Sequence, residues 1–138
     1  MKYMLIVKAS KDSEAGVMPS QELLEAMGKF NQEMVDAGVM LAGEGLQASS
    51  QGARVQFRGQ ERKVVQGPFP LTNDLVAGFW IIKVKSKEEA IEWVKRCPSP
   101  HEGDCEIEIR RVFDSEDFGP EVAAQENAMR EQMERQKK

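Results

Sequence analysis

A glutamate held between two glycines is the first feature of the sequence that points to chemistry. Glu44 lies between Gly43 and Gly45 in the segment 41–47. Glycine lets the backbone turn sharply and lets another molecule approach closely. A carboxylate at a strand end can act as a general base when it is buried. It can equally bind neighbouring backbone N–H groups and shape the turn. Glu44 is therefore the candidate catalytic base, with this architectural role as its alternative.

A second turn, at Gly67-Pro68, supplies candidate ligand-binding side chains. Both residue types favour turns, so a purely architectural turn is the alternative here as well. Four side chains around this turn and on the strand after it are candidate ligand contacts: Gln66, Phe69, Thr72 and Trp80. Gln66 can donate and accept hydrogen bonds, but it cannot transfer a proton near pH 7. We expect Glu44, Gln66 and Thr72 to share one small-molecule site.

The single histidine, His101, is a second candidate for proton transfer. It lies in loop 98–104 beside acidic residues, where a solvated histidine is the alternative. One histidine leaves carboxylates to supply the other ligands of any metal. Cys97 and Cys105 are too few for a disulfide framework and are not closely paired, so we expect unpaired thiols. No nucleophile elbow or phosphate-binding loop is recognisable. We therefore expect no metal and no bound cofactor.

Composition limits the partners. The chain has 138 residues and a net charge of −4, which suits one domain without a basic nucleic-acid footprint. Its longest apolar run, residues 75–82, is too short to span a bilayer. Residues 1–8 begin like a signal peptide, but the apolar part is short and no cleavage site follows. We expect a cytoplasmic protein that contacts neither nucleic acid nor membrane directly.

Periodicity predicts the elements that position these residues. Alternating or continuous apolar patterns predict strands over residues 2–8, 39–44, 53–58, 61–66, 76–85 and about 106–113. Helical spacing predicts one helix from the N-cap Ser20 to Gly38 and another from Ser86 to just before Pro98. The segment 121–138 is highly charged and favours a helix, with few apolar residues to anchor it.

This order predicts an α+β fold. Strand–helix–strand, an inserted hairpin and a second strand–helix–strand form a ferredoxin-like βαββαβ sandwich when the crossovers are right-handed. We place this domain at residues 1–119 and a charged C-terminal helical tail at 120–138. Two helices cover one face of the sheet, and we expect Trp80, Ile82, Met4 and Ile6 to make the opposite face apolar. A two-fold homodimer would bury that face and form a dimeric α+β barrel.

Several segments together carry a family resemblance: 1–5, 41–46, 67–69, 78–93 and 106–120. Their order and spacing resemble the DGPF family, a branch of the YCII-related proteins within the dimeric α+β barrels. The resemblance covers roughly residues 1 to 120. Three positions lack the charge that the family's eponymous segment carries: Gln66 stands for an Asp, Leu71 for a Glu and Asn73 for a Lys. The acid–base roles of that Asp and Lys therefore cannot be carried over to this chain.

Two classes of function follow. In the first, the dimer encloses an apolar pocket for a small organic molecule and performs cofactor-free isomerase or lyase-type chemistry with Glu44 as base. In the second, the protein is a non-catalytic binding or regulatory module. The resemblance implies a possible extracytoplasmic-function sigma factor as partner, with the tail helix as docking element. A buried Glu44 would favour the enzyme, and a solvent-exposed Glu44 the module.

Overall fold

The computed structural model of the chain describes residues 1–137, and Lys138, at the end of the predicted tail, lies outside them. The strands are β1 (Lys2–Lys8), β2 (Met40–Gly45), β3 (Ala53–Arg58), β4 (Glu61–Gln66), β5 (Val76–Lys83) and β6 (Ile107–Arg111). The helices are α1 (Lys11–Glu14), α2 (Gln21–Asp36), α3 (Lys87–Lys95) and α4 (Pro120–Gln136), with 3-10 helices η1 (Ser49–Gln51) and η2 (Ser115–Phe118). The sequence patterns predicted every strand, α2, α3 and α4, whereas α1, η1 and η2 were not predicted.

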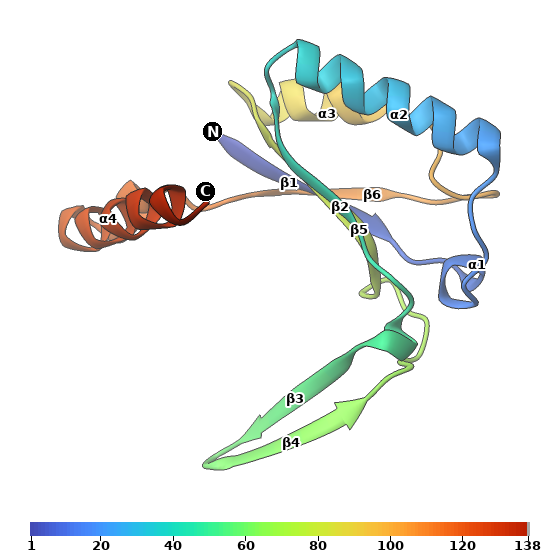
Figure 1. Cartoon of the computed structure of the whole chain (residues 1–138), viewed down its shortest axis with the longest axis horizontal. Helices are drawn as coiled ribbons and strands as arrows, with labels where there is room; N and C mark the ends of the chain where they lie inside the picture. Colours follow the sequence, from blue (N-terminus) through green and yellow to red (C-terminus); the bar gives the residue numbers. More distant parts are fainter. Residues whose placement is uncertain (138) are drawn as a thin grey trace.

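The main sheet has four strands in the order β2-β5-β1-β6, and each neighbouring pair is antiparallel. This is the strand order of a ferredoxin-like sandwich, and the predicted fold is confirmed. Helices α2 and α3 lie together on one face of the sheet (Figure 1). Strand β2 forms one edge of the sheet, so residues on it have a neighbouring strand on one side.

The helix ends follow their capping signals. The Ser20 side chain accepts a hydrogen bond from the Leu23 N–H at 3.1 Å, and Ser86 does the same for Glu89 at 3.1 Å. Each bond satisfies an N–H that has no partner inside its helix. After α2 the chain turns at Gly38 with φ +73°, a left-handed conformation that glycine adopts without steric cost.

The core lies between the sheet and the two helices. Four sheet residues are buried there against four helical residues: Tyr3, Leu5, Trp80 and Ile82 against Phe30, Met34, Ala90 and Trp93. The expectation that Trp80 and Ile82 lie on the uncovered face was wrong. Trp80 pairs with Leu5, and directly paired residues of antiparallel strands share a face. Trp80 therefore points toward the helices with Leu5.

The face of the sheet away from the helices is the open face. Its centre is formed by residues that are apolar and half-buried in the single chain: Met4, Ile6, Phe79 and Ile81. The expectation for Met4 and Ile6 therefore holds, with Phe79 and Ile81 in place of Trp80 and Ile82. Apolar side chains on both faces of β1 and β5 are typical of strands that are covered twice.

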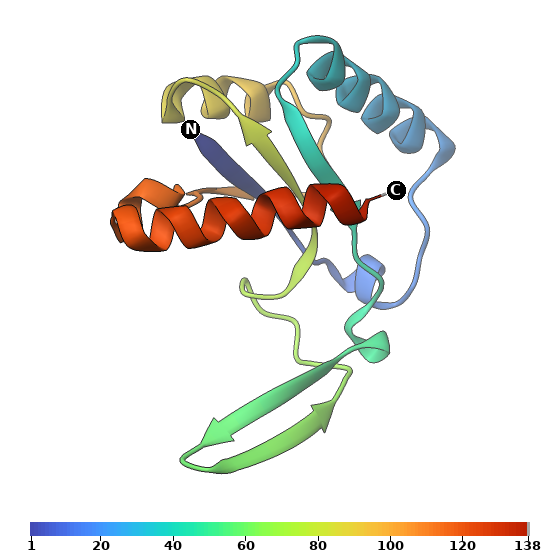
Figure 2. The ribbon, with the colours of Figure 1, turned by 60° about the vertical axis from the view of Figure 1, so that its left-hand side comes forward.

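Two parts of the chain stand apart from this sandwich. Strands β3 and β4 pair with each other as a separate two-stranded sheet with the predicted bounds, which we call the arm (Ala53–Gln66). Helix α4 is a rod beyond β6 (Figures 1 and 2) that contacts η2 and buries Ala123. Within residues 1–137, no helix combines the length and the apolar character needed to cross a membrane.

Candidate functional site

A cleft of about 1380 Å³ opens between the first helices and the edge of the sheet. Helix α1, loop 15–20 and the first half of α2 form one wall, and the ends of β2 and β5 form the other. Its apolar lining includes Leu23, Leu24, Met27, Leu46, Phe79 and Trp80. A cleft of this size with mainly apolar walls and a few polar groups can hold a small organic molecule.

Trp80 is a fixed part of the wall. Its indole Nε1 donates a hydrogen bond to Oδ1 of Asn31 at 2.8 Å, and its ring meets Phe30 edge-on with centroids 5.7 Å apart. Gly43 lies directly opposite on β2. A Cβ at Gly43 would be 2.7 Å from Trp80 Cδ1, closer than two carbon atoms can approach. Gly43 thus makes room for the indole ring.

Glu44 lies at the rim of the cleft, on the other side of β2 from Trp80. It pairs with Phe79 and shares the open face with it, because successive residues of a strand point to opposite faces. The expectation of a turn at Gly43–Gly45 was wrong. Strand β2 continues to the pair Gly45–Gly78, and the chain departs from the sheet only after the Leu46 N–H has bonded to the Ala77 carbonyl. In the single chain Glu44 is exposed.

His101 brings a polar group to the same cleft. Its Nε2 lies 2.7 Å from the backbone carbonyl oxygen of Lys8, which can only accept a hydrogen bond. Nε2 therefore carries the hydrogen, and Nδ1 is the acceptor of the neutral ring. This bond joins loop 98–106 to the end of β1 and holds His101 between the large cleft and a smaller cavity of about 420 Å³.

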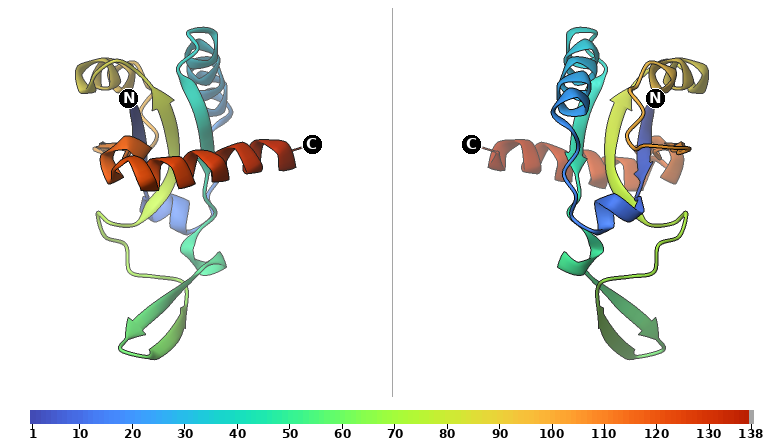
Figure 3. Two further views of the ribbon diagram at one scale, coloured as in Figure 1. Left: turned by 90° about the vertical axis from the view of Figure 1, so that its left-hand side faces the viewer. Right: turned by 90° about the vertical axis from the view of Figure 1, so that its right-hand side faces the viewer.

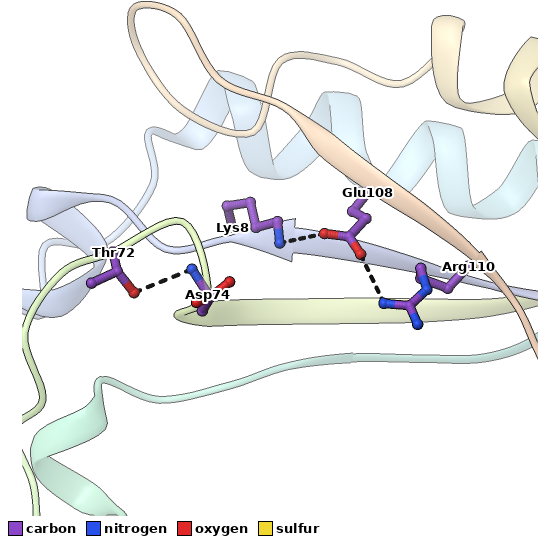
Figure 4. Close-up of polar contacts among 5 residues, drawn as sticks. All are labelled: Lys8, Thr72, Asp74, Glu108 and Arg110. Carbon is purple, nitrogen blue, oxygen red and sulfur yellow. Dashed lines mark hydrogen bonds and ion pairs between the residues drawn. The ribbon is translucent and has the colours of Figure 1, made fainter.

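The other predicted contacts lie outside the cleft. Gln66 ends β4 opposite Ala53 at the base of the arm, and the Phe69 ring lies 3.9 Å from the guanidinium carbon of Arg54. The Thr72 hydroxyl accepts a hydrogen bond from the Asp74 N–H at 3.2 Å (Figure 4). The structure therefore brings Glu44, Trp80 and His101 to one cleft and does not bring Gln66, Phe69 and Thr72 to it. The ligand-binding roles of those three residues stay predictions.

A junction around Ser49 explains the turn at Gly67. The Ser49 N–H donates to Glu14 Oε2 at 2.8 Å, its hydroxyl donates to Glu14 Oε1, and the Phe69 N–H donates to Ser49 Oγ at 2.9 Å. These hydrogen bonds from Ser49 lower the pKa of Glu14. A Cβ at Gly67 would lie 1.8 Å from the Ser49 carbonyl oxygen, so the turn fits tightly. Sequence reasoning missed Glu14 and Ser49, which are 35 residues apart and carry no motif.

A chain of charges borders the open face along β6 (Figure 4). Lys8 Nζ lies 2.7 Å from Glu108, and Arg110 Nη1 lies 3.2 Å from the same carboxylate. The hydrogen bond from Lys8, followed by that from Arg110, lowers the pKa of Glu108. Glu108 pairs with Ile6 and Arg110 with Met4, so the charges lie beside the apolar centre of this face.

The cysteines and carboxylates do not converge. Burial, together with the nearby Cys105, raises the pKa of Cys97 to about 11. The Cys105 thiol is exposed and lies 3.2 Å from the Ser99 hydroxyl. Among residues 1–137, no three side chains of the metal-ligating types are placed to share a metal ion.

Comparison with known protein families identifies the domain. The family model of the YCII-related domain matches residues 1–116, which include β1 to β6 and every residue that lines the cleft. No curated protein matches the chain. The match covers most of the chain and agrees with the observed sandwich. The chain therefore belongs to the YCII-related family.

Proposed function

We propose that this protein is a homodimer that binds a small, largely apolar organic molecule in the cleft between α2 and the β2–β5 edge. The observation that carries the proposal is the cleft itself, because it gathers an apolar wall, a fixed indole ring and two polar groups, Glu44 and His101. Pockets that bind small molecules combine apolar area with a few placed polar groups in this way.

The dimer follows from the open face. Ile6, Phe79 and Ile81 lie at the centre of a sheet whose other face is already covered by helices. Exposing these apolar side chains to water costs free energy. The same face of a second copy would bury them in a two-fold dimer. A stable interface of this kind buries about 1,500 Å² or more. Glu44 shares this face, so the dimer would also cover Glu44.

Binding without turnover is the form of function that the residues support best. Glu44 is exposed in the single chain. Gln66 stands where the family resemblance implies an Asp, and an amide cannot transfer a proton near pH 7. Cofactor-free isomerase or lyase-type chemistry would require the partner sheet to bury Glu44, since an exposed carboxylate is a weak base. The proposal therefore places binding first and acid–base chemistry second.

The test is a binding assay with 1-aminoanthracene, a fluorescent apolar amine, and a panel of small aromatic compounds that displace it. Leu24→Arg puts a charge on the apolar wall and should weaken binding at least about tenfold. Leu71→Arg is the matched control, because Leu24 is 46% exposed, Leu71 is 49% exposed, and Leu71 does not line the cleft. Equal loss in both variants, or no saturable binding to the wild type, would contradict the proposal.

A second candidate function rests on α4. This helix contacts the rest of the protein mainly through η2, and Met129 and Met133 are 55% and 58% exposed. An exposed helix with two methionines one turn apart can dock on a protein partner, for which an extracytoplasmic-function sigma factor is our candidate. An immobilised extracytoplasmic-function sigma factor should capture the wild-type protein and the Leu24→Arg variant. It should not capture the double variant Met129→Asp with Met133→Asp. Equal capture by both variants would exclude α4 as the docking element.

A further inference from the structure

The arm extends away from the body of the protein. In Figures 1 and 3 it projects on the side opposite α2 and α3, which is the side of the open face. Every residue of β3 is exposed, and so is every residue of β4 except Val65, which is half-buried. A two-stranded hairpin is at best marginally stable in water when nothing packs on it. The arm therefore has the character of a contact element that is not covered by its own chain.

One face of the arm is apolar. Val55 pairs with Val64, and Phe57 pairs with Arg62, so these four side chains share a face. Phe57 is 71% exposed, and the Arg62 guanidinium lies 4.3 Å from its ring centroid. Large aromatic side chains with an arginine beside them are typical of the centre of protein interfaces. The opposite face carries Gln56 and Lys63 and is polar.

The cleft offers a matching surface. Met18 and Leu46 line it and are 76% and 51% exposed, which leaves apolar area uncovered. Its charged side chains are mainly acidic: Asp12, Glu14, Glu44 and Glu102, with Lys11 as the basic one. The arm is the reverse, with the basic residues Arg54, Arg58, Arg62 and Lys63 and one acid, Glu61. An arm placed on this cleft would set apolar area against apolar area and bring basic side chains near acidic ones.

A contact between arm and cleft would join different copies, because the arm extends away from the body of its own chain. Glu44 lies both on the open face and at the rim of the cleft, so in the proposed dimer the cleft opens beside the interface. An arm that extends past the interface would reach the cleft of the other copy. The geometry points to an exchange in which the arm of one protomer closes the partner's cleft. Val55, Phe57 and Val64 of the arm would pack against the apolar wall of that cleft. This inference rests on the dimer proposed above.

Site-specific photocrosslinking tests the exchange. One chain carries p-benzoyl-L-phenylalanine in place of Phe57, and it is mixed with an equal amount of ¹⁵N-labelled wild-type chain. The expected adduct joins the unlabelled arm to ¹⁵N peptides that contain residues 12–27 or 43–48. The control chain carries the same probe in place of Gln56, on the polar face of the arm, and should give this adduct in much lower yield. Sedimentation of the wild type is measured in parallel.

The outcomes separate the two proposals. A wild-type dimer whose Phe57 probe gives no adduct with the partner's cleft would overturn the exchange and leave the open-face dimer standing. A monomeric wild type would overturn both. As a second readout, Phe57→Ser with Val64→Ser should raise the dimer dissociation constant at least about tenfold. The uncharged, exposed pair Gln56→Ser with Gln60→Ser should change it less than about threefold. Equal effects of the two pairs would also overturn the exchange.

Discussion

The indole ring of Trp80 occupies the space that a side chain at Gly43 would need. The two residues are paired across β2 and β5, and the hydrogen bond from Trp80 to Asn31 prevents the ring from moving aside. The expected role of this glycine was to turn the chain. Its observed role is to let the edge strand approach a large ring that also forms one wall of the cleft.

Gly43→Ala should therefore destabilise the protein. The added methyl group would meet Trp80 Cδ1 at 2.7 Å and Met40 Cε at 2.6 Å, and overpacking of this kind costs about 1–3 kcal/mol. Urea unfolding measures the change. Gly45→Ala is the matched control on the same strand, where a Cβ meets nothing within 4 Å, and its effect should be at most about 1 kcal/mol in the stabilising direction. An equal loss of unfolding free energy in both variants would show that contact with the Trp80 ring is not what excludes a side chain at residue 43.

The junction of Glu14 with Ser49 should make stability depend on pH. The folded pKa of Glu14 is lowered, so its stabilisation is present above the unfolded value of 4.5 and is lost as the pH falls through the folded pKa. Glu14→Gln should therefore lose less stability than the wild type between about pH 6 and pH 3. Glu121→Gln, an exposed acid on α4, is the control and should follow the wild type. Parallel curves for Glu14→Gln and the wild type would contradict this role.

Gly67→Ala should loosen the base of the arm and spare the core. A Cβ there would overlap the Ser49 carbonyl oxygen at 1.8 Å, so the turn must move away from η1. Hydrogen exchange should rise in residues 53–66 and stay unchanged in β1 and β5, because the arm is a separate sheet. Gly52→Ala is the control, since its Cβ would meet the same oxygen at 3.6 Å, an ordinary contact. Unchanged hydrogen exchange of residues 53–66 in Gly67→Ala would contradict the tight contact between Gly67 and the Ser49 carbonyl oxygen.

The two cysteines should react at different rates. Burial raises the pKa of Cys97 to about 11, so about a thousandth of it is thiolate at pH 8, and the thiolate is the reactive form. Cys105 is exposed. Mass spectrometry after brief treatment of the native protein with iodoacetamide should find Cys105 modified well before Cys97. In urea the two rates should converge, and equal rates in the native protein would contradict the burial of Cys97.

The sequence predicted the elements of the fold more fully than their contacts. Strand alternation and capping residues are local signals, so β1, the arm and the helix starts at Ser20 and Ser86 could be placed from the chain alone. The face of Trp80 could not. Both faces of β1 and β5 are apolar, so alternation does not show which residue of one strand pairs with which residue of the other.

The candidate site was predicted in part for the same reason. Glu44, Trp80 and His101 were recognised by residue type, and the structure places all three at one cleft. The apolar wall from α2 was not predicted as part of a site, because helical spacing does not distinguish a core face from the wall of a cleft. The Ser49 junction joins residues far apart in the chain, and no local pattern records such a contact.

The most direct test of the central claim is to map where a small molecule binds. ¹H–¹⁵N spectra of the labelled protein would be recorded while 1-aminoanthracene is added. The account predicts saturable shifts that concentrate on the Trp80 indole N–H and on the amides of Leu24, Met27, Leu46 and Ala77, all of which line the cleft. Shifts that cluster on other surfaces, or that do not saturate, would contradict the claim that this cleft is the binding site.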